Sequence, residues 1–569
     1  MELAVRQEDA DVLLKQKNVL DETVLDKYRT AGQIVQTGLK YIISLINESY
    51  HLQKSDQPIS VQELCILGDS FLINLLSKVY NNQIKEKGIS YPTSIEVNEL
   101  AYGFSPELDD EGQYFFTAGD VVTISLGVQI DGYTSQVSHT LVIYPPGIEL
   151  NSEIKPEGPL LGSKADAICA SHIATETLMG LLGLSLTPEK LPIALKNEGG
   201  ISGRLLRNIV DSIAESFGCI VLPGSKIRRI RRFLAGQAEG IVAERDFKGV
   251  VWDESHQEER LLNKAPQSQE LILSDSKSNI KPSGTNNSSA IPSDEFIVLP
   301  GEVYQIDIRI SSLNDFNEVG LITLEEIDHF TGKNNKQEFN SKSTIHIRDF
   351  AINHQLKLRT SRKLLSEIDN QFSVYPFKLS YTSKHFPIDL SKDLTEQFND
   401  IKQDLKTFKL GLSELNNRHL IKSRPIQLTK FVPLEQILIS ANPTGKHGID
   451  MNKPVLPGME IPLPQLGVSS LKLKSLLNKH GKSVTNVRES ITVVINNVNN
   501  GEIIRLTGGS KSSSPSWVHS QYQLKGAYVE AINQIGQLLQ DKRFGIKVKE
   551  IYPYKLNQDK SVETSMQLD

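Results

Sequence analysis

The chain has 569 residues, of which 39% are hydrophobic and 23% are charged, so a sizeable core can form and wholesale disorder is excluded. Its formal net charge of -6 excludes a uniformly basic nucleic-acid protein but allows a local basic patch. Cys65, Cys169 and Cys219 lie far apart without CxxC spacing, so neither a zinc knuckle nor a disulfide framework is indicated. The charged residues 1–20 and the absence of a long apolar run predict a soluble intracellular protein.

Three segments have the apolar spacing of amphipathic helices. In residues 23–50, apolar side chains recur every three to four positions, which predicts the first helix. A second helix is predicted to begin at Ser202, a favourable N-cap, and to stop at Gly218. A third helix is predicted over residues 528–539.

A β-hairpin is predicted over residues 121–143. Two β-rich runs flank Asp131-Gly132, which is a preferred two-residue turn because both turn positions need a positive φ. In this register residue 125 faces residue 138, so Ser125 and Gln136 are expected to be diagonal neighbours on one face of the hairpin.

Other segments complete the expected organisation. A strand is predicted over residues 303–310, and helices mixed with antiparallel hairpins indicate the α+β class. Residues 253–294 are rich in Ser, Asn, Lys, Gln and Pro, and are predicted to be a flexible insertion because they cannot bury enough apolar surface to offset their ordering entropy. Residues 441–464, rich in Gly and Pro, are predicted to be an irregular insertion.

A set of long motifs extends over nearly the whole chain. The motifs are Tyr91-Pro92-Thr93-Ser94-Ile95-Glu96-Val97-Asn98, Gly103-Phe104-Ser105-Pro106, residues 119–128, Asp131-Gly132-Tyr133, Met1-Glu2-Leu3-Ala4-Val5, Arg29-Thr30-Ala31-Gly32-Gln33-Ile34, Phe233-Leu234-Ala235-Gly236-Gln237, Pro515-Ser516-Trp517 and Lys560-Ser561-Val562-Glu563-Thr564-Ser565. Those between 91 and 133 resemble the pita-bread fold of type-2 methionine aminopeptidases and, more closely, the proliferation-associated proteins, which are non-peptidase relatives. Taken together, the motifs most closely resemble the fungal factors associated with the ribosomal export complex.

The resemblance carries expectations for fold and function. It implies one pita-bread (methionine aminopeptidase/creatinase-like) domain over residues 1–569, with an N-terminal helical extension and the two insertions. It also implies a ribosome biogenesis factor that binds the pre-60S particle near the tunnel exit and travels with it from nucleus to cytoplasm. The partners that it implies are rRNA and tunnel-exit ribosomal proteins, FG nucleoporins and a small basic partner protein. Members of this family often carry the label probable metalloprotease.

The resemblance also indicates which metal ligands have changed. The family's peptidases bind two metal ions through two aspartates, one histidine and two glutamates. In this sequence those five ligands fall on Ser125, on Gln136, near Gly236 or Gln237, on Asp307 and near Glu489. A family histidine that contacts substrate falls on Gly103. Since at most two of the five ligands remain, we expect no catalytic residue, no metal and no cofactor, and therefore an inactive homologue of the peptidases.

The densest basic run is a candidate contact with rRNA. It consists of Lys226, Arg228, Arg229, Arg231 and Arg232, and each cation could pair with a phosphate in a salt-dependent manner. The same run could instead be a solvated strand or helix face whose interleaved apolar residues pack inward, or a nuclear localisation signal.

Two alternative functions remain open on the sequence. The chain could be an active metallopeptidase with a rearranged metal site, because the family label names that activity. It could also be a histone- or peptide-binding module, for which fold analogy is the support. His139 on the second hairpin strand is interpreted as structural, because no second ligand accompanies it.

Overall fold

The structure, a computed structural model, describes most of the chain. The described residues are 12, 16–54, 57–81, 83–110, 112–144, 148–150, 153–156, 158–233, 248–254, 256–257, 294–329, 331–332, 340–372, 374–434, 436–437, 470–498, 501–509, 517–541 and 543–556. Gly236, Gln237, the predicted insertion at 441–464 and nearly all of the one at 253–294 lie outside these residues.

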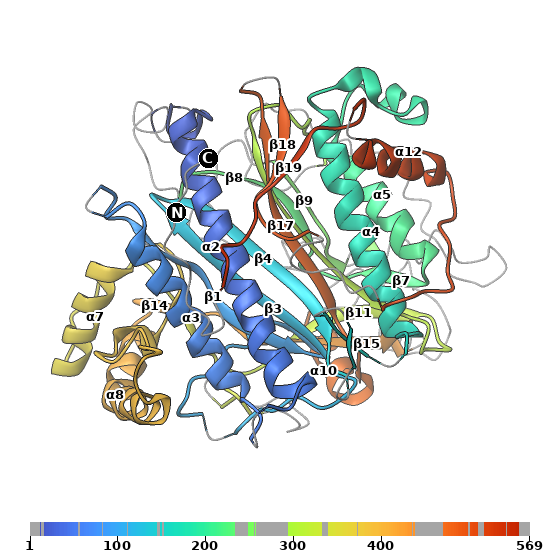
Figure 1. Cartoon of the computed structure of the whole chain (residues 1–569). Helices are drawn as coiled ribbons and strands as arrows, with labels where there is room; N and C mark the ends of the chain where they lie inside the picture. The colour runs from blue at the N-terminus through green and yellow to red at the C-terminus, as the bar shows by residue number, and fades with distance from the viewer. Residues whose placement is uncertain are drawn as a thin grey trace, which may run out of the picture.

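A ten-stranded sheet organises the fold (Figure 1). Its main path runs through β1 (Lys87–Val97), β3 (Val121–Ile130), β4 (Tyr133–Val142), β17 (Val487–Asn496), β10 (Val303–Ser312), β8 (Lys226–Ile230) and β9 (Gly249–Val251). Off this path, β7 (Cys219–Val221) pairs with β10, and β18 (Glu502–Arg505) pairs with β17 and β19 (Val548–Glu550). Its named strand pairs are antiparallel except β18 with β19.

Two pairs of helices cover one face of this sheet. Helices α2 (Glu22–Ile46) and α3 (Val61–Lys78) contact β1, β3 and β4, whereas α4 (Ser163–Leu184) contacts β10, β17 and α5 (Gly203–Ser216). Figure 1 shows α2 lying across β3 and β4 and α4 lying beside β17. Helix α12 (Val529–Gln540) packs on α4. Helices layered on one face of a mainly antiparallel sheet confirm the predicted α+β class.

The predicted elements form where local signals favour them. Asp131 and Gly132 have φ of 54° and 80°, and the strands they join pair in the predicted register. Ser202 caps α5 by accepting a hydrogen bond from the Leu205 amide, and Gly218 follows the helix with φ of 66°. The first predicted helix corresponds to α2 and the π-helical turn η2 (Asn47–His51), the third to α12, and the predicted strand to β10.

Helix α4 is the described helix that is long and apolar enough to cross a membrane, by length and composition. Its apolar window has a mean hydropathy of 1.4, and 78% of that window is buried inside the fold. The core helix of a soluble protein passes the same test.

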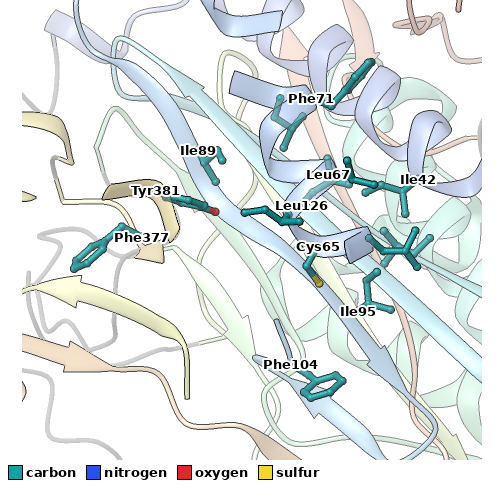
Figure 2. Packing of buried hydrophobic residues seen from close by; sticks show 14 of the residues in the cluster. Ile42, Cys65, Leu67, Phe71, Ile89, Ile95, Phe104, Leu126, Phe377 and Tyr381 are labelled. Atoms are coloured by element: carbon teal, nitrogen blue, oxygen red, sulfur yellow. The ribbon is translucent and has the colours of Figure 1, made fainter. Parts of the chain in front are cut away.

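A smaller layer packs beside strands β1, β3 and β4 of the main sheet. Its three-stranded sheet has the order β13 (Phe377–Lys378), β12 (Ile345–Arg348) and β14 (Ile421–Ser423), with α7 (Arg359–Gln371) and α8 (Leu394–Asn417) alongside. Figure 2 shows Tyr381 between Phe377 and Leu126 of β3, with Ile42 and Phe71 of the helices on the other side of Leu126. All five side chains belong to one buried hydrophobic cluster, so the small layer shares a hydrophobic core with α2, α3 and β3.

The remaining described elements connect these layers. A four-stranded sheet combines β11 (Gly320–Glu326), β15 (Gln427–Pro433), β16 (Lys482–Ser483) and β2 (Leu100–Tyr102). The others are the hairpin β5 (Ile148–Leu150) and β6 (Glu153–Lys155), α10 (Ser470–His480), η1 (Gln16–Asn18), η3 (Pro188–Lys190), η4 (Ile193–Glu198) and η5 (Leu379–Thr382).

Candidate functional site

A row of polar residues crosses the face of the main sheet opposite the helix pairs. Register partners in a sheet point to the same face, so residues paired in succession line up. The row consists of Ser94, Ser125, Ser138, Ser490, Asp307 and Lys226, from β1, β3, β4, β17, β10 and β8. The structure therefore brings Ser125 and Asp307, two of the positions that the resemblance assigned to metal ligands, onto one face.

Asp307 is held by two arginines. Arg488 of β17 makes a bidentate ion pair with it, with Nε at 2.7 Å from Oδ1 and a terminal nitrogen at 2.8 Å from Oδ2. Arg309 approaches Oδ2 at 3.7 Å. All three side chains are nearly inaccessible to water, with 1% exposure for Asp307, 3% for Arg488 and 4% for Arg309. A charge-assisted, two-pronged contact of this kind is among the stronger interactions available to a carboxylate.

The Arg488 guanidinium also reaches the strand that carries Ser125. Its other terminal nitrogen lies 3.4 Å from Ser125 Oγ and 3.4 Å from the Tyr91 hydroxyl. Ser125 Oγ donates to Ser138 Oγ at 2.8 Å, and it lies 3.4 Å from Glu96 Oε2. Arg488 thus spans the space between Ser125 and Asp307.

The pKa values of Asp307 and Glu96 are shifted in opposite directions. Burial raises the pKa of Asp307, but the charges of Arg488 and Arg309 outweigh burial and lower it to about 2. For Glu96, burial dominates over the charge of Arg488 and raises its pKa. Asp307 is therefore a firmly ionised partner of the arginines, and Glu96 holds a proton more readily than an exposed glutamate.

Gln136, the second position assigned to an aspartate, joins the same face one step along the hairpin. Its Oε1 accepts a hydrogen bond of 2.7 Å from Gln305 Nε2, and its own Nε2 has no hydrogen-bond partner. An amide pair therefore stands where the resemblance places a ligand carboxylate. Gly103, the position of the substrate-contacting histidine, has φ of 81° and donates its amide to Glu96.

Glu489 does not join Asp307. It pairs in register with Ile308, so it lies on the helix-covered face, whereas its neighbours Arg488 and Ser490 face the polar row. Its Oε1 lies 2.9 Å from Nδ1 of His139 and accepts the Thr140 amide at 3.0 Å. The two acids assigned as residual ligands are therefore on opposite faces of the sheet. His139, interpreted from the sequence as structural, contacts Glu489 on the helix-covered face.

The basic run lies on β8 and the loop after it. Lys226 and Arg228 are half-buried and pair in register with Asp307 and Gln305. Arg229 is buried and contacts Glu302 at 3.2 Å, and Arg232 contacts Asp131 at 2.5 Å. Arg231 is half-buried. The alternation of strand side chains thus sends the cations to both faces, and their role in binding rRNA stays a prediction.

The donor set does not fit a pair of divalent metal ions. Such a site needs several ionised carboxylates or imidazoles around two metals about 3.5–4 Å apart. Ser125 and Gln136 are neutral, and both oxygens of Asp307 are engaged by Arg488. Among the described residues, no group of three or more His, Cys, Asp or Glu side chains could hold a metal ion.

Restoring two aspartates alone should not restore metal binding. In Ser125→Asp/Gln136→Asp we expect less than a tenth of an equivalent of zinc or cobalt per chain, because Arg488 would pair with the new carboxylates as it does with Asp307. Elemental analysis after dialysis, with the wild type alongside, measures this. Two metals per chain in either protein would show that the arginine does not block the site.

Sequence reasoning missed Arg488, Glu96 and Arg309. A signal for Arg488 exists in the alternation of polar Arg488, Ser490 and Thr492 along β17, which marks one strand face. Glu96 is on β1, which lies beside β3 in the sheet but is separated from it in the sequence, and no local pattern ties Glu96 to the site.

Comparisons with known proteins place the chain in a family. No family model matches it. It is 66% identical to "Probable metalloprotease ARX1" of Candida albicans over 100% of both chains. It is 48% identical to the protein of the same name from Saccharomyces cerevisiae, over 99% of this chain and 98% of that one.

A solved structure supports the fold. "Structure of a thermophilic Arx1" covers 91% of this chain and 98% of its own, with a TM-score of 0.52 and 17% identity. The pita-bread fold predicted from the sequence is confirmed. With two thirds or more of the chain matched at well over 30% identity, the chain belongs to the family of fungal proteins named probable metalloprotease Arx1.

Proposed function

We propose that the protein is a ribosome biogenesis factor without peptidase activity. It binds the pre-60S particle near the tunnel exit, travels with it from nucleus to cytoplasm, and promotes assembly and nuclear export of the large subunit. The observation that carries the non-catalytic part is the buried Arg488–Asp307 ion pair where peptidases of this fold would hold metal. The resemblance of the chain to factors associated with the ribosomal export complex supports the ribosomal part.

The chemistry of the ion pair opposes hydrolysis. Dinuclear peptidases use their metals to activate a water and to polarise the substrate carbonyl. A guanidinium remains protonated at physiological pH and offers no open coordination position, so Arg488 supplies neither a metal-bound hydroxide nor a Lewis acid. Asp307, the acid in the polar row, has both oxygens engaged by Arg488, so it is not free to act as a general base.

The partners follow from the same proposal. The basic run at residues 226–232 contacts rRNA phosphates, with tunnel-exit ribosomal proteins completing the interface. FG nucleoporins and a small basic protein are the further partners. Shuttling between nucleus and cytoplasm accompanies these contacts, and the inactive site serves as part of a binding platform.

Sedimentation tests the proposal. In a sucrose gradient of a cell lysate we expect the protein to migrate with 60S precursors and to dissociate as salt rises, because phosphate contacts release counterions. Arg231→Ala should weaken binding and reduce the slope of log affinity against log salt by about 1. Arg204→Ala, at an exposed position on α5, is the matched control and should behave as the wild type.

Each outcome has a distinct meaning. Migration at 60S that ignores salt would contradict electrostatic rRNA contact, and an Arg231→Ala protein with the wild-type slope would remove this arginine from the interface. Metal-free protein that stays at the top of the gradient would overturn the ribosomal role and favour a histone- or peptide-binding module.

The second candidate is a working metallopeptidase with a rearranged metal site, which the name of the relatives, probable metalloprotease, favours. It requires stoichiometric metal and a peptidase activity that Asp307→Ala abolishes. The geometry around Asp307 opposes it, because the arginine would have to leave before a metal could bind.

A further inference from the structure

A cavity of about 570 Å³ opens in the small layer, apart from the polar row. It is lined by α8, by β12 and β14 of the three-stranded sheet, and by the loops after β2 and β11. Ligand pockets in proteins measure about 300–1,000 Å³, so the volume fits a small ligand or a short piece of a chain. At about 30 Å³ for each molecule of liquid water, the cavity has the volume of roughly nineteen waters, which is more than one long side chain displaces.

One wall of the cavity is mainly apolar and belongs to helix α8. Leu405, Lys409, Leu412 and Asn416 follow one another at intervals of four, three and four residues, so they lie on the same face of the helix. Leu405 is buried and Leu412 is half-buried. Leu379 of η5 adds a third leucine to the lining. These leucines offer a surface on which the aliphatic stem of a long side chain can pack.

A nearly buried imidazole lines the cavity from β12. His346 is 4% exposed, and its Nδ1 lies 3.0 Å from Oγ of Ser423, its register partner on β14. The Ser423 hydroxyl donates to Asn416 Oδ1 at 3.4 Å, so it accepts from Nδ1 and leaves Nε2 as an acceptor. In the described part of the chain, Nε2 has no hydrogen-bond partner.

The protonation of His346 decides which ligands this acceptor suits. Burial, aided by the charge of His329, lowers the pKa of His346 to about 4, so the ring is neutral at physiological pH. A neutral acceptor without a partner, on the wall of a cavity, favours a ligand that donates a hydrogen bond.

Acidic residues form another part of the lining. Glu107, Asp109 and Asp110 outnumber the lysines of the lining, which are Lys342 and Lys409. Lys409 places its ammonium 2.5 Å from Asp109 Oδ2, but its side chain is 56% exposed, so this is a surface ion pair that water screens. The pair shows that an ammonium on an aliphatic stem fits this acidic wall.

Glu107 contributes less to this wall than the two aspartates. Burial raises its pKa, and the charge of Lys378 opposes that effect. Lys378 also lies 3.7 Å from Asp69 Oδ2, so it is shared between two acids. Asp109 and Asp110 are half-buried, whereas Glu107 is buried. A cation that enters the cavity therefore belongs at the two aspartates.

We propose that this cavity binds a lysine side chain of a polypeptide partner. The ammonium lies at Asp109 and Asp110, the stem packs on Leu405 and Leu412, and an adjoining main-chain N–H donates to His346 Nε2. The main chain of the partner occupies the volume that the lysine side chain leaves. The inference does not depend on the ribosomal role, because it involves neither the basic run nor the polar row.

Titration calorimetry on the full chain tests the proposal with three matched peptides. Each is an acetylated and amidated tripeptide with alanine at both ends and lysine, norleucine or glutamate in the middle. We expect the wild type to bind the lysine peptide about ten-fold more tightly than the norleucine peptide, because only the ammonium forms charge-assisted hydrogen bonds. The glutamate peptide should bind most weakly.

Two tryptophan variants test the location. Ser413 and Thr407 are exposed on α8, and each hydroxyl donates to the carbonyl four residues earlier. Ser413 lines the cavity, whereas Thr407 lies outside the lining. Ser413→Trp should fill the cavity and weaken binding of the lysine peptide by about ten-fold, whereas Thr407→Trp should bind it as the wild type does.

A third variant tests the imidazole without filling the cavity. His346→Phe removes the Nε2 acceptor, so the lysine and norleucine peptides should both bind about five-fold more weakly. The preference for lysine over norleucine should remain, because the aspartates are unchanged. Should Ser413→Trp not fold, this comparison decides in its place.

Several outcomes would overturn the proposal. They are a lysine peptide that does not bind or binds no better than the norleucine peptide, a glutamate peptide that binds most tightly, and a Ser413→Trp protein that binds as Thr407→Trp does. A free diamine, 1,5-diaminopentane, separates the two sources of an ammonium. If it binds as tightly as the lysine peptide, the ligand is a free amine and the polypeptide partner is wrong.

Discussion

Replacing Arg488 with methionine is expected to destabilise the protein by about 3 kcal/mol, because removing one partner leaves a buried carboxylate without its main counter-charge. Asp307 is 1% exposed, so water cannot replace the lost bonds. Arg309, now 3.7 Å away, can move to Asp307 and keeps the cost near the lower end for buried pairs. Urea denaturation followed by fluorescence and circular dichroism measures the change.

A compensating change separates the charge from the packing. Adding Asp307→Asn to Arg488→Met removes the stranded charge and should recover about half of the lost stability. Arg359→Met on α7 is an exposed control that should change the free energy of unfolding by less than about 0.5 kcal/mol. The buried pair would be unimportant to stability if Arg488→Met unfolded at the same urea concentration as this control.

The Arg488–Asp307 ion pair also determines how the stability of Arg488→Met should depend on pH. The pKa of Asp307 is about 2 in the folded protein, below its ordinary value of 3.8, because Arg488 and Arg309 outweigh burial. A depressed folded pKa contributes stability that is present above 3.8 and lost as pH falls through about 2. This contribution is about 2 kcal/mol at neutral pH. The acid-side loss should be smaller in Arg488→Met than in the wild type.

The second large effect is expected from Lys378→Met, at about 4 kcal/mol. Lys378 of β13 and Asp69 of α3 are both fully buried, with Nζ 3.7 Å from Oδ2. Glu107, also buried, lies near the same ammonium, and burial raises the pKa of Asp69 and of Glu107. Without the lysine, two acids remain in a dry cluster without their cation.

The position of Lys378 in the fold predicts which elements are destabilised first in Lys378→Met. Asp69 and Lys378 connect a helix of the main body to the small layer, so Lys378→Met should loosen α7 and α8 first. Denaturation and limited proteolysis measure this, with cleavage expected between residues 345 and 423. Lys363→Met, at an exposed ion pair on α7, is the control, and equal stability of the two variants would contradict the prediction.

Local signals explain which elements could be predicted. The cap at Ser202, the glycine at 218 and the Asp131-Gly132 turn act within a few residues, so the sequence shows them directly. Helices α3 and α4 were missed because their apolar residues surround the helix. Most positions of α4 are buried, so no polar stripe marks its 3.6-residue period.

The positions of the site residues could be predicted only on the hairpin, because only there could the strand register be predicted. The turn fixes Ser125 and Gln136 on one face, as expected from the sequence. On β17 no turn fixes the register, and a shift of one residue exchanges Arg488 for Glu489 on that face. The resemblance assigned the last metal ligand to the acid Glu489, but the charged side chain that lies in the site is that of Arg488.

The main sheet is weakly joined along its middle. Strands β4 and β17 share one registered pair, Ser138 with Ser490. Beside it, Thr140 Oγ1 bonds the backbone of Arg488, and Thr492 Oγ1 bonds the backbone of Gln136. Side-chain hydroxyls thus replace a continuous backbone ladder at this seam. We therefore expect the half that contains β1, β3 and β4 and the half that contains β17, β10 and β8 to be separate cooperative folding units. Each half should be able to open without unfolding the other.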